Sequence, residues 1–190
     1  MKNILEEIAA RTRERIAKEK TCISVSELEN RIQEVNKNAG KRITLLQALQ
    51  KDGMSYICEV KKASPSKGLI APDFPYLAIA KEYEQAGASA ISCLTESFYF
   101  QGADQYLREI AAAVKIPVLR KDFTVDEYMI YEAKLLGASA ILLICSLLTE
   151  KQIREFLSVC DELGLSALVE THDENEISAA VNAGARIIGV

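Results

Sequence analysis

Charged side chains close three short apolar stretches of the sequence. The first stretch ends with Glu59 and Lys61, the second ends with Lys121, and the third ends with Glu170. A charge at the end of an apolar strand is costly unless it is paired or used. Two lysines and two glutamates at one end of a sheet would provide a proton donor and a proton acceptor at neutral pH. Solvated strand ends or a structural ion-pair network remain the alternative.

Polar and aromatic segments follow these stretches. The loop Ser64–Gly68 offers hydroxyl groups and the Lys67 ammonium, which suit a phosphate, although Ser-Pro-Ser sequences are also common in turns. The aromatic run Phe98–Phe100, and Phe123 further on, would form a lid or a ring-binding pocket. An ordinary role as anchors of loops fits the same residues equally well.

Other kinds of site are disfavoured by the residue types. The five cysteines are odd in number and show no CxxC spacing, which argues against a disulfide framework and a zinc site. We expect them to be small buried side chains in a reducing compartment. His172 is the single histidine, so a Ser-His-Asp triad or a histidine-rich metal site is difficult to build. The sequence predicts neither a cofactor nor a metal.

The composition is that of an ordinary globular protein. The 190 residues carry a net charge of −4, and 49% of them are hydrophobic. No cluster of lysine and arginine suggests a nucleic-acid partner. No apolar run approaches the roughly 20 residues that cross a bilayer, and the charged N-terminus is unlike a signal peptide. We therefore expect a cytoplasmic protein without a membrane or nucleic-acid partner.

Six β-rich runs alternate with amphipathic stretches of helical length. The runs begin at Tyr56, Ser89, Pro117, Ser139, Ser166 and Arg186, and the helices are expected over 76–85, 104–113, 126–136, 150–163 and 174–182. This alternation predicts βαβ units and a parallel sheet. Gly87, Gly137 and Gly184 recur before the strands, each followed by alanine, and are expected to end helices with positive φ.

Two further helices are expected before the first strand. Ile4, Leu5, Ile8 and Ile16 recur at helical spacing, and a second helix is expected to begin from a Ser26 cap with Glu29 completing a capping box. These elements predict an N-terminal helical extension over 1–45 that packs on the main domain. Asp73, Thr124 and Thr149 are further candidates for helix caps.

The predicted fold class is α/β, with an incomplete (β/α)8 TIM barrel of about six parallel strands. No GxGxxG or GxxxxGK[ST] motif follows the first strand, which disfavours a doubly wound nucleotide-binding sheet. A complete barrel needs about 250 residues, whereas the sixth strand here ends at Val190. We expect one truncated domain over 1–190, with the βα units in 55–190.

Five segments in order resemble indole-3-glycerol phosphate synthase. They are EVKKASPSKG (Glu59–Gly68), TESFYFQG (Thr95–Gly102), PVLRKDF (Pro117–Phe123), ILLICSLLTE (Ile141–Glu150) and LVETHDENE (Leu168–Glu176). The resemblance extends over essentially the whole chain and includes the helical extension. It implies a (β/α)8 carboxy-lyase of tryptophan biosynthesis that needs no cofactor. Such an enzyme converts 1-(2-carboxyphenylamino)-1-deoxyribulose 5-phosphate into indole-3-glycerol phosphate with loss of CO₂ and water.

The resemblance also implies roles for individual residues. Lys121 would be the general acid in ring closure, and Glu170 a general base or a stabiliser of charge. Lys61 would contact the substrate carboxylate or phosphate and supply a proton in dehydration, while Glu59 would hold hydroxyl groups and orient Lys61. The expected binding residues are Ser64 for phosphate or carboxylate, and Phe100, Phe123 and Leu142 for the anthranilate ring.

The resemblance stops before the last part of the family's barrel. An active-site Asn would follow Val190, and strands with Glu-Ser-Gly and a Gly-Ser phosphate site would come later. We therefore expect little or no activity from the 190 residues alone. Full-length members of the family are often monomeric, whereas exposed strand edges could let this chain self-associate. The alternatives are another ribulose-phosphate-binding barrel enzyme, or a non-catalytic fragment that assembles through those edges.

Overall fold

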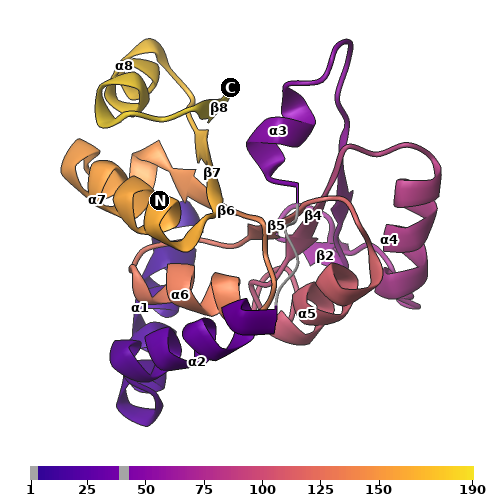
Figure 1. Cartoon of the computed structure of the whole chain (residues 1–190), viewed down its shortest axis with the longest axis horizontal. Coiled ribbons are helices and arrows are strands. Elements are labelled where there is room, and N and C mark those ends of the chain that lie inside the picture. Colours follow the sequence, from indigo (N-terminus) through magenta and orange to yellow (C-terminus); the bar gives the residue numbers. More distant parts are fainter. Residues whose placement is uncertain (1–3, 39–42) are drawn as a thin grey trace. The chain divides into compact units, whose positions relative to one another are not determined.

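The computed structural model describes residues 4–38 and 43–190 and has the predicted α/β class (Figure 1). The main sheet has the order β1-β4-β5-β6-β7-β8. The strands of this sheet therefore lie side by side in the same order as in the chain, as in (β/α)8 barrels. In a doubly wound sheet the strand order reverses part-way across the sheet. This order and the parallel pairing confirm the predicted fold class. The strands are β1 (Ile57–Val60), β4 (Ala90–Leu94), β5 (Val118–Lys121), β6 (Ala140–Ile144), β7 (Ser166–Glu170) and β8 (Ile187–Gly189).

A helix leads from each of the first five strands of the main sheet, β1, β4, β5, β6 and β7, to the next strand of that sheet. These helices are α4 (Tyr76–Gln85), α5 (Asp104–Ala113), α6 (Tyr128–Leu135), α7 (Glu150–Leu163) and α8 (Glu174–Ala183), with a 3₁₀ turn η1 (Cys145–Leu147) before α7. Thr149 caps α7 in a full capping box with Gln152, as its sequence position predicts. Gly87, Gly137 and Gly184 have φ of 92°, 87° and 95°, which confirms their predicted place at helix ends.

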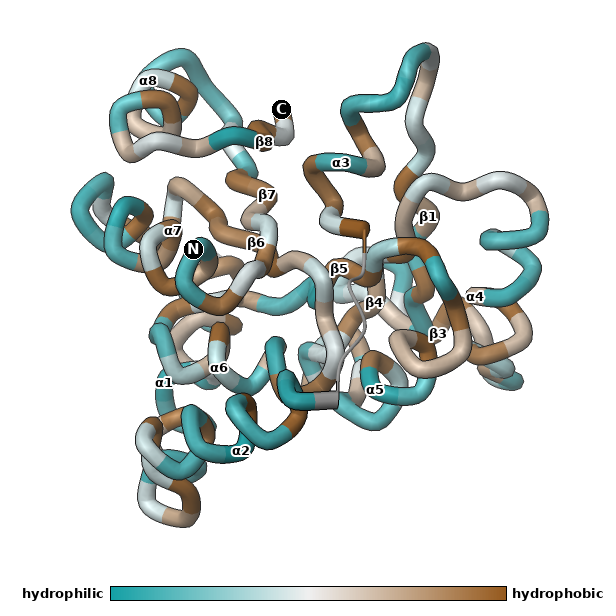
Figure 2. Tube along the Cα trace, in the orientation of Figure 1, coloured by the Kyte–Doolittle hydropathy of each residue, from teal (hydrophilic) through white to brown (hydrophobic). Residues whose placement is uncertain are grey.

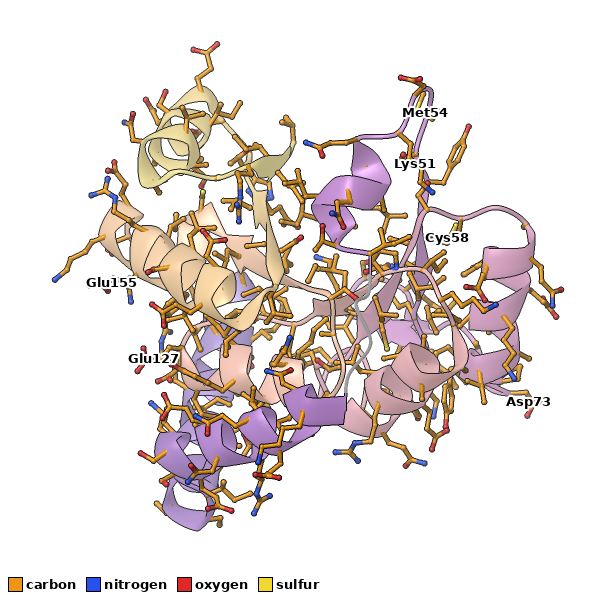
Figure 3. The ribbon with its side chains drawn as sticks, viewed as in Figure 1. Lys51, Met54, Cys58, Asp73, Glu127 and Glu155 are labelled. Atoms are coloured by element: carbon orange, nitrogen blue, oxygen red, sulfur yellow. The ribbon has the colours of Figure 1, made fainter. Side chains whose placement is uncertain are left out.

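Two of the expected caps are wrong. Asp73 is exposed (Figure 3), and α4 begins from Pro75 without a side-chain cap. Thr124 lies four residues before α6, and Asp126 instead accepts a hydrogen bond from the Tyr128 N–H at 2.9 Å. Both residues lie too far upstream, because a capping residue directly precedes the first helical residue, here Tyr76 in α4 and Tyr128 in α6.

Three short elements were not expected from the sequence. Helix α3 (Leu45–Leu49) begins from Thr44, which forms a capping box with Gln47. The predicted polar loop after β1 contains a small antiparallel pair, β2 (Ala63–Ser64) with β3 (Gly68–Leu69). Such short elements have no periodicity that a sequence could reveal, since α3 has five residues and β2 and β3 have two each.

The structure divides into two compact units, which we describe separately. The first unit comprises residues 4–38, 123–135 and 141–190. In it, α1 (Ile4–Cys22) and α2 (Val25–Asn38) pack with α6 around a shared core that includes Ile16, Leu28 and Met129. Figure 2 shows hydrophobic and hydrophilic residues interleaved along α1 and α2, as expected for helices that bury one face. Helices α1 and α2 therefore pack on a helix of a βα element of the same unit, whereas residues 1–3 and 39–42 of the predicted extension lie outside the described residues.

The start of α2 differs from the prediction. The Ser24 hydroxyl, rather than that of Ser26, accepts a hydrogen bond from the third backbone N–H of the helix, at Glu27. Ser24 and Ser26 each have a glutamate three residues on, so the capping-box pattern fits both. The difference is that Ile23 and Leu28, which flank a cap at Ser24 in the positions of a hydrophobic staple, both pack into the core.

This choice of cap predicts a difference between two exposed serines. Ser24→Ala should lower the free energy of unfolding by about 1 kcal/mol because an N–H of α2 loses its acceptor. Ser26→Ala should change it by less than about 0.5 kcal/mol, as for most surface substitutions. Urea titrations followed by circular dichroism measure both values, and an equal effect of the two substitutions would contradict the assignment.

The second unit comprises residues 43–122 and 136–140. Helices α4 and α5 cover one face of its strands β1, β4 and β5, and the buried side chains on that side include Ala80, Leu107 and Ile110. The register pairs Glu59 with Ser92, Ser92 with Leu119, and Leu94 with Lys121. Because side chains alternate along a strand, Lys121 and Glu59 lie on the same face, opposite Arg120.

Candidate active-site residues

The Glu59 and Lys61 side chains form an ion pair at the end of β1. Their side chains are 31% and 33% exposed, so both groups are partly shielded while remaining accessible. Alternation along the strand puts them on one face, and the ion pair agrees with the prediction that they point the same way. An ammonium and a carboxylate held together in this way can bind a polar substrate and exchange a proton with it.

Lys121 ends β5 on the same face as Glu59. Its partner across the sheet is Leu94, and its carbonyl accepts a hydrogen bond of 3.1 Å from the backbone N–H of Thr95. The ends of β4 and β5 are therefore joined at the level of Lys121. Two lysines and one carboxylate thus occupy the ends of β1 and β5 in this unit.

Ser64 and Ser92 are two hydroxyl-bearing residues of this unit, one in β2 after the end of β1 and the other inside β4. Ser64 is 9% exposed and accepts a hydrogen bond from the Lys67 N–H, which folds the predicted phosphate loop back on itself. Ser92 is 4% exposed, and its hydroxyl has no hydrogen-bond partner among the described residues. Ser92 pairs with Glu59, so this polar group lies on the same face as the charged pair.

The aromatic loop after β4 is folded around Glu96. This carboxylate is 6% exposed and accepts hydrogen bonds from three successive backbone N–H groups, those of Phe98, Tyr99 and Phe100, at 3.0, 2.7 and 2.9 Å. The Glu96 carbonyl accepts another from Gly102. Charge-assisted hydrogen bonds of this kind are stronger than neutral ones, so they hold the loop in one conformation.

Gly102 closes the same loop by a close approach of two backbones. A Cβ at this position would collide with the Leu94 carbonyl oxygen and lie 2.8 Å from the Thr95 carbonyl carbon. Only glycine fits there. The aromatic run was expected to form a lid, a ring-binding pocket or an anchor of the loop. It lies in a loop held by hydrogen bonds, with Phe98 61% exposed and Phe100 half-buried.

A buried polar network lies on the other face of β5. The Arg120 side chain is 1% exposed and contacts the Thr95 hydroxyl at 3.2 Å, Asp104 at 3.1 Å and Asp122 at 3.7 Å. The Thr95 hydroxyl donates to Asp122 at 2.7 Å. We call these four residues the Arg120 network. It compensates for the charge of a guanidinium that would otherwise be very costly to bury.

The first unit contains the remaining expected site residues. Glu170 ends β7 with a side chain 32% exposed, and its carboxylate is 3.5 Å from His172. His172 is also held by Glu176, at 3.3 Å from the ring and 2.8 Å from the backbone N–H. Phe123 is 8% exposed and Leu142 is 1% exposed. The Leu142 side chain is therefore a core residue within this structure.

The cysteines are free thiols in the structure, and Cys93, Cys145 and Cys160 are buried as expected. The expectation is wrong for Cys22, which is exposed near the end of α1, and for Cys58, which is only partly buried. Burial raises the pKa of Cys93 and the pKa of Cys160 to about 12, so both are protonated and unreactive at neutral pH.

Within the described residues, no group of three or more histidine, cysteine or acidic side chains is arranged to hold a metal ion. No helix in the described ranges is both long enough and apolar enough to cross a membrane.

Comparison with known sequences identifies the family. The sequence model of the family "Indole-3-glycerol phosphate synthase" matches residues 5–190. The chain belongs to the indole-3-glycerol phosphate synthase family. It is similar to the indole-3-glycerol phosphate synthase of Ruminiclostridium cellulolyticum, with 52% identity over 98% of this chain and 71% of that protein. The protein of the same name from Endomicrobium trichonymphae is 51% identical over 98% of this chain and 72% of its own length.

Membership of the indole-3-glycerol phosphate synthase family makes this the sequence of a carboxy-lyase of tryptophan biosynthesis. A solved N-acetylmannosamine-6-phosphate 2-epimerase from Clostridium perfringens is similar in fold alone, with a TM-score of 0.58 and 14% identity. That match covers 80% of this chain and 66% of the epimerase. The fold is therefore shared with enzymes of other chemistry, and the family assignment rests on the sequence.

Sequence reasoning missed three of the residues described above. Glu96 and Arg120 lie inside the quoted motifs, but their types alone do not reveal whether they face solvent, the substrate or the backbone. A signal was available for Arg120, because charged residues at 120, 121 and 122 alternate between two faces of one strand, so they cannot all serve one site. Ser92 carried no signal, since it is a small residue in an apolar run.

Proposed function

We propose that Lys121 is the general acid of the ring-closing step in the conversion of 1-(2-carboxyphenylamino)-1-deoxyribulose 5-phosphate to indole-3-glycerol phosphate. The observation that carries this role is the position of Lys121 at the end of β5, on the face that also bears the Glu59–Lys61 ion pair. Barrel enzymes place their catalytic groups at the carboxyl ends of strands. A lysine there can donate its proton to a substrate carbonyl oxygen as the ring forms.

The other roles follow from the same chemistry. Lys61 binds the substrate carboxylate or phosphate and supplies a proton in dehydration, while Glu59 binds hydroxyl groups and orients Lys61 through their ion pair. Glu170 acts as a base or stabilises developing positive charge. Ser64 binds phosphate or carboxylate, and Phe100, Phe123 and Leu142 contact the anthranilate ring. Leu142 has the weakest support, because it is 1% exposed.

The substrate class, the absence of a cofactor, the single domain and the cellular compartment are also parts of this proposal. The substrate is a small phosphorylated molecule, and no cofactor takes part. A single family match over residues 5–190 supports one domain rather than two independent ones. The free thiols of all five cysteines suit a reducing compartment, and so a cytoplasmic enzyme.

Turnover by the complete protein that carries this sequence tests the proposal. Indole absorbance and CO₂ release should appear together, and a chelator should leave the rate unchanged. Lys61→Met should raise KM about tenfold or more, because a charged hydrogen bond to the substrate contributes about 1.5–3 kcal/mol. Lys62→Met, which alters the next residue along the chain, should leave KM within about twofold, a difference below 0.5 kcal/mol. A rate abolished by the chelator, or equal KM values for both variants, would contradict the assignment.

A further inference from the structure

The position of Arg120 is unusual for a charged residue in a strand. It lies on the face of β5 opposite Lys121, and its side chain is 1% exposed. A buried ion pair is weak evidence of added stability, because the cost of removing both charges from water can exceed their attraction. The Arg120 network therefore calls for an explanation beyond stability.

The contacts of Arg120 connect both ends of one loop. Thr95 directly precedes the loop 96–103, and Asp104 directly follows it as the first residue of α5. Arg120 contacts the Thr95 hydroxyl at 3.2 Å and the Asp104 carboxylate at 3.1 Å. A single guanidinium thus holds the two ends of the loop that Glu96 organises from within. The planar, forked geometry of arginine suits such a double contact, whereas lysine offers one point charge.

The same network surrounds Lys121 along the chain. Arg120 precedes Lys121 and Asp122 follows it, with Asp122 0% exposed in its side chain. Thr95 connects these parts twice. Its hydroxyl donates to Asp122 at 2.7 Å, and its backbone N–H donates to the Lys121 carbonyl at 3.1 Å. The Lys121 carbonyl is therefore bonded directly, and the side chains of both neighbouring residues are held by the same network.

We propose that the Arg120 network is a positioning device that sets Lys121 and the aromatic loop in one fixed arrangement for catalysis. Arg120, Thr95, Asp122 and Asp104 are positioning residues, since Arg120 lies on the face of β5 opposite Lys121, the other three contact Arg120, and all four act through Lys121. A displacement of about 1 Å in a catalytic group can lower the rate about 100-fold, so a rigid connection of this kind has a large kinetic value. This inference rests on the acid role proposed for Lys121.

The hydroxyl of Thr95 provides the sharpest test. Thr95→Val keeps the shape of the side chain but removes its contacts with Asp122 and Arg120, whereas Thr95→Ser keeps the hydroxyl. In the complete protein, Thr95→Val should lower kcat about 10- to 100-fold with KM changed less than about threefold. Thr95→Ser should restore kcat to within about threefold of the wild-type value, a difference below 1 kcal/mol.

A matched control separates positioning from stability. Thr44→Val removes the hydroxyl that caps α3, in the same unit but far along the chain from Lys121. It should lower the melting temperature while leaving kcat unchanged at temperatures where circular dichroism shows a folded protein. A folded Thr95→Val variant with wild-type kcat, or a Thr95→Ser variant that loses as much as Thr95→Val, would overturn the proposal.

A double mutant distinguishes the positioning role of the Arg120 network from the acid role of Lys121 itself. In a Lys121→Met protein, adding Thr95→Val should lower the residual kcat no further, because the network acts through the lysine. A full additional loss would overturn the positioning role while leaving the acid role intact. If Lys121→Met alone retained full kcat, the acid role would fail first, and the positioning role with it.

A milder variant covers the case in which Thr95→Val does not fold. The Asp104 side chain is 40% exposed, so Asp104→Ala should preserve the fold while releasing one end of the loop from Arg120. We expect kcat to fall several-fold and Asp104→Asn, which keeps an oxygen for the guanidinium, to recover most of it. Equal kcat values for Asp104→Ala and the wild type would overturn the proposal.

Discussion

Lys121→Met should lower kcat by about 10²- to 10⁴-fold, the usual contribution of a general acid. The substitution removes the ammonium group and keeps a side chain of similar length. Because Lys121 is at the end of β5 with its backbone held by Thr95, the fold should survive the change. Steady-state turnover to the indole product, measured on the complete protein, gives kcat and KM, and circular dichroism gives the folded fraction.

Two further variants isolate the proton from the charge. Lys121→Arg keeps the positive charge, but a guanidinium does not give up its proton at neutral pH, so kcat should fall about as far as in Lys121→Met. Lys115→Met, at an exposed position just before β5, should leave kcat within about twofold. A Lys121→Arg protein with more than a tenth of the wild-type kcat would show that charge, rather than proton transfer, is what Lys121 contributes.

Glu96→Ala should lower the free energy of unfolding by about 3 kcal/mol. The carboxylate is 6% exposed, and its loss leaves the N–H groups of Phe98, Tyr99 and Phe100 without this acceptor. Hydrogen bonds to charged groups contribute about 1.5–3 kcal/mol each, but water can replace part of the loss in a partly exposed loop. Urea titration of the purified protein measures the difference, and KM should rise because the proposed ring contact at Phe100 is on this loop.

The size of this effect depends on the charge and on the site. Glu96→Gln keeps one acceptor oxygen and should recover about half of the lost free energy, since neutral hydrogen bonds are about half as strong. Glu82→Ala, on the exposed side of α4, should change the free energy of unfolding by less than about 0.5 kcal/mol. Equal losses from Glu96→Ala and Glu82→Ala would show that the loop is held by other contacts.

The regular elements were predictable because their causes are local. Alternating and helical spacings of apolar residues indicated every strand of the main sheet and the helices that follow them. Gly137 and Gly184 ended helices as predicted, since glycine can adopt positive φ without steric strain wherever it lies in the chain. The prediction of a barrel rather than a doubly wound sheet depended on absent motifs and on a resemblance, and it was the strand order that confirmed it.

The prediction of the helix cap failed where two neighbouring positions matched the capping pattern equally well. Ser24 and Ser26 both match a capping box, and the choice between them came from Ile23 and Leu28 packing with residues of α6 more than 90 positions away. The spacing of residues along the sequence does not reveal a contact between residues so far apart in the chain. The caps expected at Asp73 and Thr124 were also wrong, although the start of α4 at Tyr76 was predicted correctly.

The sequence by itself determined the class of the protein and the charged residues at its strand ends, Glu59, Lys61, Lys121 and Glu170. Those residues were visible because a charge after an apolar run is rare and costly wherever the strand lies. Only the tertiary structure decided that Arg120 is buried against Thr95, Asp104 and Asp122, and that Glu96 faces the backbone of its own loop. The physical reason is that a charged side chain takes its role from its partners, and partners distant in the sequence are brought together only by folding.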